Sequence, residues 1–222
     1  MTAAGLRARA TGWPPHVAVL AVAALTAAAL AAGETPSPEM VASAGEGEGL
    51  ALRVAVPLLL RIPSLQVDAP VLGVGITPAN VMAAPSGPAG DPVWGKAFWY
   101  RGGGIPGDVG TATIAGHVDD VLGRPAAFAR LEDLHVGDTV VVHDTRNGLD
   151  VTFVVTETET YSTAQTSDPA VLARLYGAGP VAGTGPEPAA DGLSHLVLIT
   201  CAGTWGGHAY DHRLAVFAQR AG

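Results

Sequence analysis

The chain has 222 residues, a length that suits one sizeable domain with additional segments. Hydrophobic residues make up 48% and charged residues only 14%, which excludes a wholly disordered protein, because disordered chains combine low hydrophobicity with many charges. Twenty acidic and 12 basic residues give a net charge of −8. A basic nucleic-acid-binding surface is therefore excluded, and we expect no nucleic-acid partner.

The N-terminal region has the pattern of a targeting segment. Arg7 and Arg9 are the only charges before an apolar stretch at 17–32, in which Thr26 is the only polar side chain. Counted from residue 12, the segment reaches the range of about 17–25 residues that a membrane-spanning helix needs. Because basic residues stay on the cytoplasmic side, we expect a cytoplasmic tail at 1–11, a membrane segment at 12–32 and export of the rest.

Two forms of the membrane segment stay open. The small residues at 30–33 suit a signal peptidase and would make the segment a cleaved signal peptide, whereas an intact segment would be a signal anchor. The anchored form predicts a single-pass protein of the cell membrane with an extracellular domain, and the cleaved form predicts a secreted protein. Residues 33–57 begin with a run of Gly, Pro, Ser, Ala and Glu, which favours a flexible linker before a globular domain at 58–222.

The first half of this domain carries short strand patterns. Residues 61–72 predict a short strand broken by prolines, as edge strands tolerate, and residues 111–116 predict a strand that leads into His117. Residues 138–143 and 149–158 predict a hairpin, because the Asn147–Gly148 pair between them is a strong turn signal.

The second half combines few helical patterns with further strands. Residues 128–134 and 169–176 predict short helices, the latter after the N-cap residue Asp168. Residues 193–200 predict a strand that ends at Cys201, and residues 213–219 predict the last strand. Many short strands with Gly and Pro turns predict a mainly β fold, either a closed barrel or a sandwich. The Gly- and Pro-rich residues 177–192 predict a long mobile loop.

Cys201 is the only cysteine, which excludes an internal disulfide and a multi-cysteine zinc site. It is either a buried structural thiol, since free cysteines are among the most buried residues, or a reactive nucleophile. Eleven residues, 202–212, separate Cys201 from Arg213. If their strands pair as antiparallel neighbours, the two residues face each other across a spacing of about 4.8 Å.

Cys201, Arg213 and His117 together suit acyl transfer. A thiolate attacks a carbonyl, and a nearby cation lowers the pKa of the thiol. The fixed donors of Arg213 suit an oxyanion, and His117 is able to protonate a leaving amine and later to deprotonate an incoming nucleophile.

Three motifs then resemble those of the sortases, the cysteine transpeptidases of Gram-positive bacterial surfaces. They are residues 115–119 (Ala-Gly-His-Val-Asp), 198–201 (Leu-Ile-Thr-Cys) and 210–218 (Tyr-Asp-His-Arg-Leu-Ala-Val-Phe-Ala), with supporting matches at 61–71, 98–103 and 128–138. The resemblance runs in order from about residue 58 to residue 220. The pattern is most similar to the actinobacterial class F type, with class E next.

The resemblance implies an eight-stranded sortase β-barrel and assigns roles to single residues. The nucleophile falls on Cys201, the general acid and base on His117, and the oxyanion-stabilising arginine on Arg213. Thr200 matches the threonine that helps to shape the substrate groove, and Asp119 matches an acidic position near the histidine. Trp205, four residues past the cysteine, is our own candidate for the wall of that groove.

The implied reaction cleaves a Leu-Pro-x-Thr-Gly-like sorting signal of surface proteins between Thr and Gly and forms a thioacyl-enzyme. A cell-wall precursor amine then accepts the acyl group. We expect no cofactor and no metal site; His208 and His212 have helical metal-ligand spacing but lie in a Gly-rich loop. Two alternatives are a non-catalytic surface-binding module on a sortase-like barrel and another cysteine transpeptidase of the cell wall, such as an L,D-transpeptidase, whose Ser-x-Gly-Cys signature is missing here.

Overall fold

The computed structural model describes residues 54–77, 81–177 and 188–222. The predicted cytoplasmic tail, the membrane segment and most of the predicted linker lie outside these residues, as does most of the predicted loop at 177–192. Among the residues described, no helix has both the length and the apolar composition to cross a bilayer.

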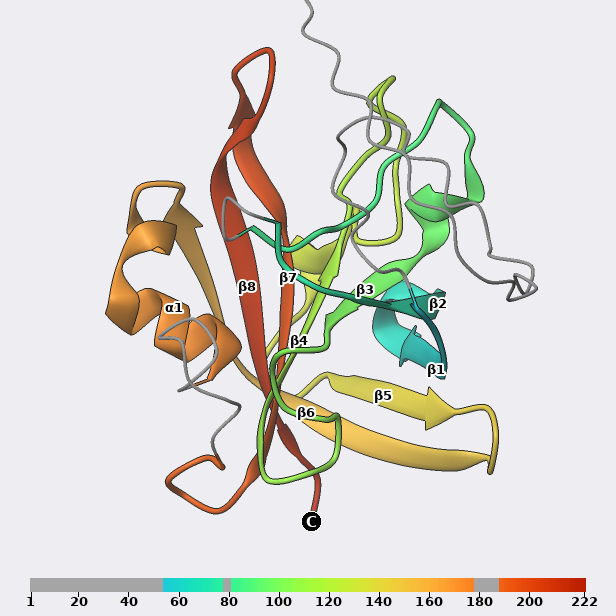
Figure 1. The fold of residues 1–222 in the computed structure, drawn as a ribbon, viewed down its shortest axis with the longest axis vertical. Helices are drawn as coiled ribbons and strands as arrows, with labels where there is room; N and C mark the ends of the chain where they lie inside the picture. Colours follow the sequence, from blue (N-terminus) through green and yellow to red (C-terminus); the bar gives the residue numbers. More distant parts are fainter. Residues whose placement is uncertain (1–53, 78–80, 178–187) are drawn as a thin grey trace, which may run out of the picture. The chain divides into compact units, whose positions relative to one another are not determined.

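Eight strands form a closed barrel (Figure 1). They are β1 (Val54–Ile62), β2 (Val67–Val74), β3 (Ala97–Tyr100), β4 (Gly110–Gly116), β5 (Thr139–Asp144), β6 (Leu149–Ser162), β7 (Ser194–Trp205) and β8 (Tyr210–Arg220). Their order around the barrel is β1-β2-β3-β4-β7-β8-β6-β5, and β1 pairs with β5 to close it. The β2–β3 and β4–β7 pairs are parallel and the others antiparallel. The predicted mainly β, closed eight-stranded barrel is confirmed.

The prediction of a single edge strand at 61–72 is wrong. The chain forms two antiparallel strands here, β1 and β2, and Arg61 pairs with Asp68 across them. Pro63 opens a 3-10 turn at Pro63–Leu65, and Gln66 takes a left-handed φ of 57°, which reverses the chain. Because the barrel is closed, neither strand lies at an edge. β1 also begins at Val54, inside the range 33–57 that the sequence assigns to a linker.

The β5–β6 hairpin is confirmed, with Asp144 paired to Leu149 and Gly148 in the left-handed region at φ 74°. The helix α1 (Pro169–Tyr176) is also confirmed. Asp168 caps it, because its carboxylate Oδ1 accepts a hydrogen bond of 2.7 Å from the amide of Ala170.

The predicted helix at 128–134 is wrong, because this segment contains only a 3-10 turn, Leu131–Asp133. Phe128 before this turn, Leu131 within it and Leu134 after it are all buried. These three side chains therefore reach the barrel core from a turn, and the segment forms no α-helix.

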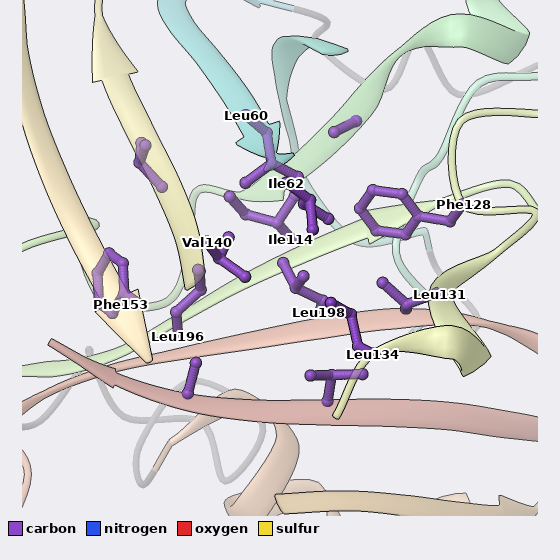
Figure 2. Packing of buried hydrophobic residues seen from close by; sticks show 14 of the residues in the cluster. Leu60, Ile62, Ile114, Phe128, Leu131, Leu134, Val140, Phe153, Leu196 and Leu198 are labelled. Carbon is purple, nitrogen blue, oxygen red and sulfur yellow. The ribbon is translucent and has the colours of Figure 1, made fainter. Parts of the chain in front are cut away.

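The barrel interior holds the main hydrophobic core. Figure 2 shows side chains from β1, β4 and β7 pointing into one space, among them Leu60, Ile114 and Leu198, all fully buried. Along β7 the interior positions are 196 and 198, and along β8 they are 214, 216 and 218.

The outer face of β7 and β8 packs against α1, which lies beside β8 in Figure 1. Val197 and Ile199 of β7 and Ala215 of β8 form a second cluster with Leu175 of α1. Successive side chains of a strand alternate between faces. Cys201 follows Ile199 by two residues, and therefore it shares this outer face.

Candidate active site

Cys201 lies opposite Arg213 in the antiparallel β7–β8 ladder. The preceding pairs, such as Ile199 with Ala215, are in regular register, so Cys201 and Arg213 project from the same outer face. The predicted pairing of these two strands is confirmed.

The predicted end of the strand at Cys201 is wrong. β7 continues to Trp205, β8 already begins at Tyr210, and only residues 206–209 connect them. The ladder shifts between Ala202 and Trp205, where Gly203 adopts φ 82°, and the carboxylate of Asp211 accepts a 2.7 Å hydrogen bond from the amide of Thr204. Because of this bulge, the ladder continues past the two site residues to the pair of Trp205 with Tyr210. Figure 1 shows β7 and β8 joined in this hairpin.

Main-chain carbonyls of its own strand hold the guanidinium of Arg213. Nη1 donates hydrogen bonds to the carbonyl oxygens of Tyr210, at 3.0 Å, and of His212, at 2.7 Å. A guanidinium has five N–H donors, and these two bonds leave others for a ligand at the sulfur.

Burial and neighbouring charges act on the half-buried thiol of Cys201. Burial raises its pKa above the ordinary value, the positive charge of Arg213 lowers it, and the negative charge of Asp119 raises it. Burial is the largest of the three effects, so the resting thiol is protonated at neutral pH. Arg213 is the group that favours its thiolate.

His117 directly follows β4, which runs parallel to β7 with Ala115 opposite Ile199. The Thr200 hydroxyl donates a 2.9 Å hydrogen bond to the carbonyl oxygen of Gly116. Thr200 and Gly116 are the chain neighbours of Cys201 and His117, so this bond joins the two strand positions that carry the predicted nucleophile and the predicted acid.

The imidazole of His117 packs against two aromatic side chains. Its ring centroid lies 4.7 Å from that of Trp94 and 5.3 Å from that of Phe98. Nε2 lies 2.8 Å from the carbonyl oxygen of Pro85. A carbonyl only accepts, so Nε2 donates in this contact and Nδ1 is the ring nitrogen that lies outside it.

Asp119 lies in the loop after His117 and contacts the β7–β8 hairpin. Its carboxylate Oδ2 accepts a hydrogen bond from the hydroxyl of Tyr210, with 2.5 Å between the oxygens. The Tyr210 ring also packs against Trp205, with 5.2 Å between centroids, and Trp205 is 56% exposed. Two hydrogen bonds, from Thr200 to Gly116 and from Tyr210 to Asp119, thus join the segment at 116–119 to the β7–β8 hairpin, which carries the other predicted site residues.

Sequence reasoning missed Tyr210 as a site residue. It stands in the motif at 210–218, three residues before Arg213, but a tyrosine in a strand pattern gives no sign of a partner 91 positions away. The described residues contain no group of three His, Cys, Asp or Glu side chains arranged for a metal ion. A cavity of about 340 Å³ borders Trp94 and Asp68 and is lined by none of the predicted site residues.

The comparison with protein families decides the identity of this barrel. A family model described as Sortase domain matches residues 60–221, nearly three quarters of the chain. The chain belongs to the sortase family. Sortases are cysteine transpeptidases, and Cys201 is the only thiol of this one.

Solved sortase structures share the fold. A lid mutant of sortase A from Corynebacterium diphtheriae is 19% identical, with a TM-score of 0.50 over 78% of this chain and 73% of that one. Sortase C-1 from Actinomyces oris is 20% identical, with a TM-score of 0.50 over 76% of this chain and 75% of that one. No curated protein gave a significant match. The likeness to class F or class E stays a prediction.

Proposed function

We propose that this sortase cleaves a Leu-Pro-x-Thr-Gly-like sorting signal of surface proteins and transfers the acyl group to a cell-wall amine. One observation carries the proposal: Cys201 faces Arg213 across the β7–β8 ladder, while Thr200 binds the residue before His117. A thiol and a fixed cation on paired strands, with an imidazole at the end of the neighbouring strand β4, suit acyl transfer.

In the first step, the Cys201 thiol gives its proton to Nδ1 of His117, and the resulting thiolate attacks the carbonyl carbon of the signal's threonine. The S–C bond forms, and Arg213 donates hydrogen bonds to the resulting oxyanion. When the oxyanion collapses, the C–N bond to glycine breaks, and His117 protonates the departing amine at its nitrogen through Nδ1. A thioacyl-enzyme remains.

In the second step, the acceptor amine attacks the thioester carbon. His117, neutral after the first step, takes the proton that the amine loses, and the C–S bond breaks to release the Cys201 thiolate. His117 then returns this proton to the sulfur, which restores the resting thiol. The product is a new amide, so one peptide-type bond replaces another and no oxidant or cofactor is consumed.

Trp205, Asp119 and Thr200 are proposed to line the substrate groove. Trp205 is exposed beside Tyr210 and offers an aromatic surface to an extended peptide. Thr200 is 4% exposed and its hydroxyl is engaged by Gly116, so it shapes the groove through the backbone of β7.

The proposed location is the outer face of the cell membrane, with class F as the proposed type. The apolar segment at 12–32 and the basic residues before it support a single membrane anchor with the barrel outside. The mass of the mature protein distinguishes the anchor from a cleaved signal peptide. Protease cleavage of residues 1–11 from outside intact cells would contradict a cytoplasmic tail.

The test is turnover of fluorogenic sorting-signal peptides by the full chain in detergent, with the products identified by mass spectrometry. We expect cleavage between Thr and Gly, a thioacyl adduct on Cys201 and loss of both in Cys201→Ala. Turnover that survives this substitution would contradict the nucleophile. A folded protein that binds signal peptides and cleaves none would instead be the non-catalytic binding module.

A further inference from the structure

Tyr210 is in contact with two parts of the site at once. Through its main-chain carbonyl it accepts a hydrogen bond from Nη1 of Arg213, and through its hydroxyl it donates one to Asp119. Asp119 lies two residues after His117 in the chain. Tyr210 therefore connects the arginine of β8 with the loop that carries the histidine.

We propose that the Tyr210–Asp119 hydrogen bond is a positioning latch that holds the loop after His117 against the β7–β8 hairpin, and thereby holds the histidine beside Cys201 and Arg213. The inference rests on the proposed roles of these three residues. It makes Tyr210 a positioning residue, which acts on the reaction through Asp119 and Arg213.

The tyrosine end of the latch is held by the hairpin. Tyr210 pairs with Trp205 beyond the β-bulge, and the two rings pack at 5.2 Å. The orientation of the ring is therefore set by Trp205 and the strand backbone, and only the hydroxyl reaches Asp119. Replacing tyrosine with phenylalanine removes the bond and keeps the ring contact.

The aspartate end is held by its own loop. Asp119 forms an isolated antiparallel bridge with Pro125. The next residue, Asp120, accepts hydrogen bonds from the amides of Leu122, at 2.8 Å, and Arg124, at 3.1 Å. Because both ends are held, the bond transmits the position of the hairpin to the loop.

The latch also brings a negative charge to the thiol. Three groups act electrostatically with Cys201: Arg213 on β8 lowers its pKa, Asp119 in the loop raises it, and Tyr210 is itself influenced by the thiol. Donation to Asp119 is the largest cause that raises the pKa of Tyr210 to about 12, so the hydroxyl remains a donor through neutral pH. Asp119 thus has two separable properties, an acceptor atom and a charge.

Three substitutions in the full chain separate these properties. Tyr210→Phe removes the donor, and we expect kcat to fall about tenfold with a smaller change in KM, because a charge-assisted hydrogen bond that orients the acid is lost. Asp119→Ala removes acceptor and charge and lowers kcat at least as much. Asp119→Asn keeps an accepting oxygen, so its kcat falls less than that of Asp119→Ala.

The effect of the Asp119 charge on the thiol can be measured directly. The rate of Cys201 alkylation by iodoacetamide against pH gives the pKa of the thiol whether or not any peptide is a substrate. Asp119→Asn moves this midpoint to lower pH, since the carboxylate no longer opposes the thiolate. The matched control is Asp150→Asn. It removes an exposed carboxylate of β6, which lies 2.6 Å from the imidazole of His143 on β5, and the alkylation midpoint of this variant stays at the wild-type pH.

A double-mutant cycle tests whether the Tyr210–Asp119 hydrogen bond acts as the proposed latch. In the Asp119→Ala background, Tyr210→Phe should add no further loss of kcat, because the bond is already broken. Additive losses, or a Tyr210→Phe variant that lowers the thermal midpoint and leaves kcat intact, would overturn the proposal. If the wild-type protein turns over no peptide, the proposed function is contradicted and the latch is judged from alkylation. An Asp119→Asn midpoint equal to that of the wild-type protein would then contradict a position of Asp119 close to the thiol.

Discussion

The thiol of Cys201 and the guanidinium of Arg213 extend from directly opposed positions on the outer face of the β7–β8 ladder. The interior residues of the same strands, such as Leu198 and Val216, belong to the core. One face of each strand therefore packs into the core, and the other face carries the predicted catalytic side chains. Their opposition depends on register, because a shift of one residue sends every side chain to the other face.

We predict that Arg213→Lys lowers kcat about 100-fold although the positive charge remains. The planar guanidinium donates in fixed directions, and loss of one oxyanion donor typically costs this much or more. The measurement is single-turnover acylation of Cys201 by a sorting-signal peptide. Arg220→Lys is the matched control, because Arg220 lies on the same strand and donates at 2.9 Å to the carbonyl oxygen of Gly107. Near-normal acylation by Arg213→Lys would contradict the oxyanion role.

Thr200→Val tests the bond between β7 and β4. The substitution is close to isosteric and removes the 2.9 Å hydrogen bond to Gly116, so we expect a loss of about 1 kcal/mol in the free energy of unfolding and a fall in kcat. Thr113→Val is the control, because the hydroxyl of Thr113 on β4 donates at 2.8 Å to the carbonyl oxygen of Leu175 in α1 and makes no contact with His117 or Cys201. It should lose similar stability and keep its kcat. Equal falls in kcat for both variants would show a general effect of stability.

Gly116→Ala should destabilise the protein by about 1–3 kcal/mol, the usual cost of overpacking. A Cβ at Gly116 would lie 2.5 Å from the ring of Phe128, which is 1% exposed and cannot move without disturbing the core. Since Gly116 precedes His117, kcat should fall as well. Gly75→Ala, where an added Cβ meets no atom within 4 Å, is the control for denaturant unfolding. A fully stable Gly116→Ala protein would contradict the tight packing.

Asp120 gives a prediction for the pH dependence of stability. Its hydrogen bond with the Arg124 side chain is the main cause that lowers its pKa to about 2. The charged form stabilises the folded protein, so this contribution is present above the ordinary carboxyl pKa of about 4 and is lost as the pH falls toward about 2. The thermal midpoints of the wild-type protein and Asp120→Asn should therefore differ near neutral pH and converge in acid.

The control for this experiment is Asp144→Asn in the β5–β6 turn, where Arg146 similarly lowers the pKa of Asp144 to about 2. Both variants should converge with the wild-type protein in acid. Only Asp120→Asn should also slow acyl transfer, because Asp120 organises the loop after His117. A difference in midpoint that persists at low pH would show that the charge of Asp120 is not its cause.

Local patterns predicted the elements whose signals lie within a few residues. The Asn147–Gly148 turn and the Asp168 cap depend on backbone preferences and neighbouring amides, and both were confirmed. The prediction at 61–72 was wrong because Gln66 reverses the chain in a left-handed conformation and because barrel closure leaves no edge. The prediction at 128–134 was wrong because this segment packs against the core. Such contacts join residues far apart in the chain.

The site shows the same division. Cys201, His117 and Arg213 were predicted as site residues from their residue types, their order and their motifs. Tyr210 was missed, because its role depends on an oxygen that belongs to Asp119, 91 residues away. The continuation of β7 to Trp205 was missed as well, since a β-bulge depends on the partner strand.

Local sequence features were enough to show a single cysteine, to indicate a mainly β chain and to predict a site of Cys201, His117 and Arg213. These follow from counts, alternation and turn chemistry, which act over a few residues. The folded barrel is needed to show that Cys201 faces Arg213, that Thr200 binds the backbone beside His117 and that Tyr210 reaches Asp119. Register, strand order and hydrogen bonds between distant loops arise when the barrel closes, because only then do segments far apart in the chain lie side by side.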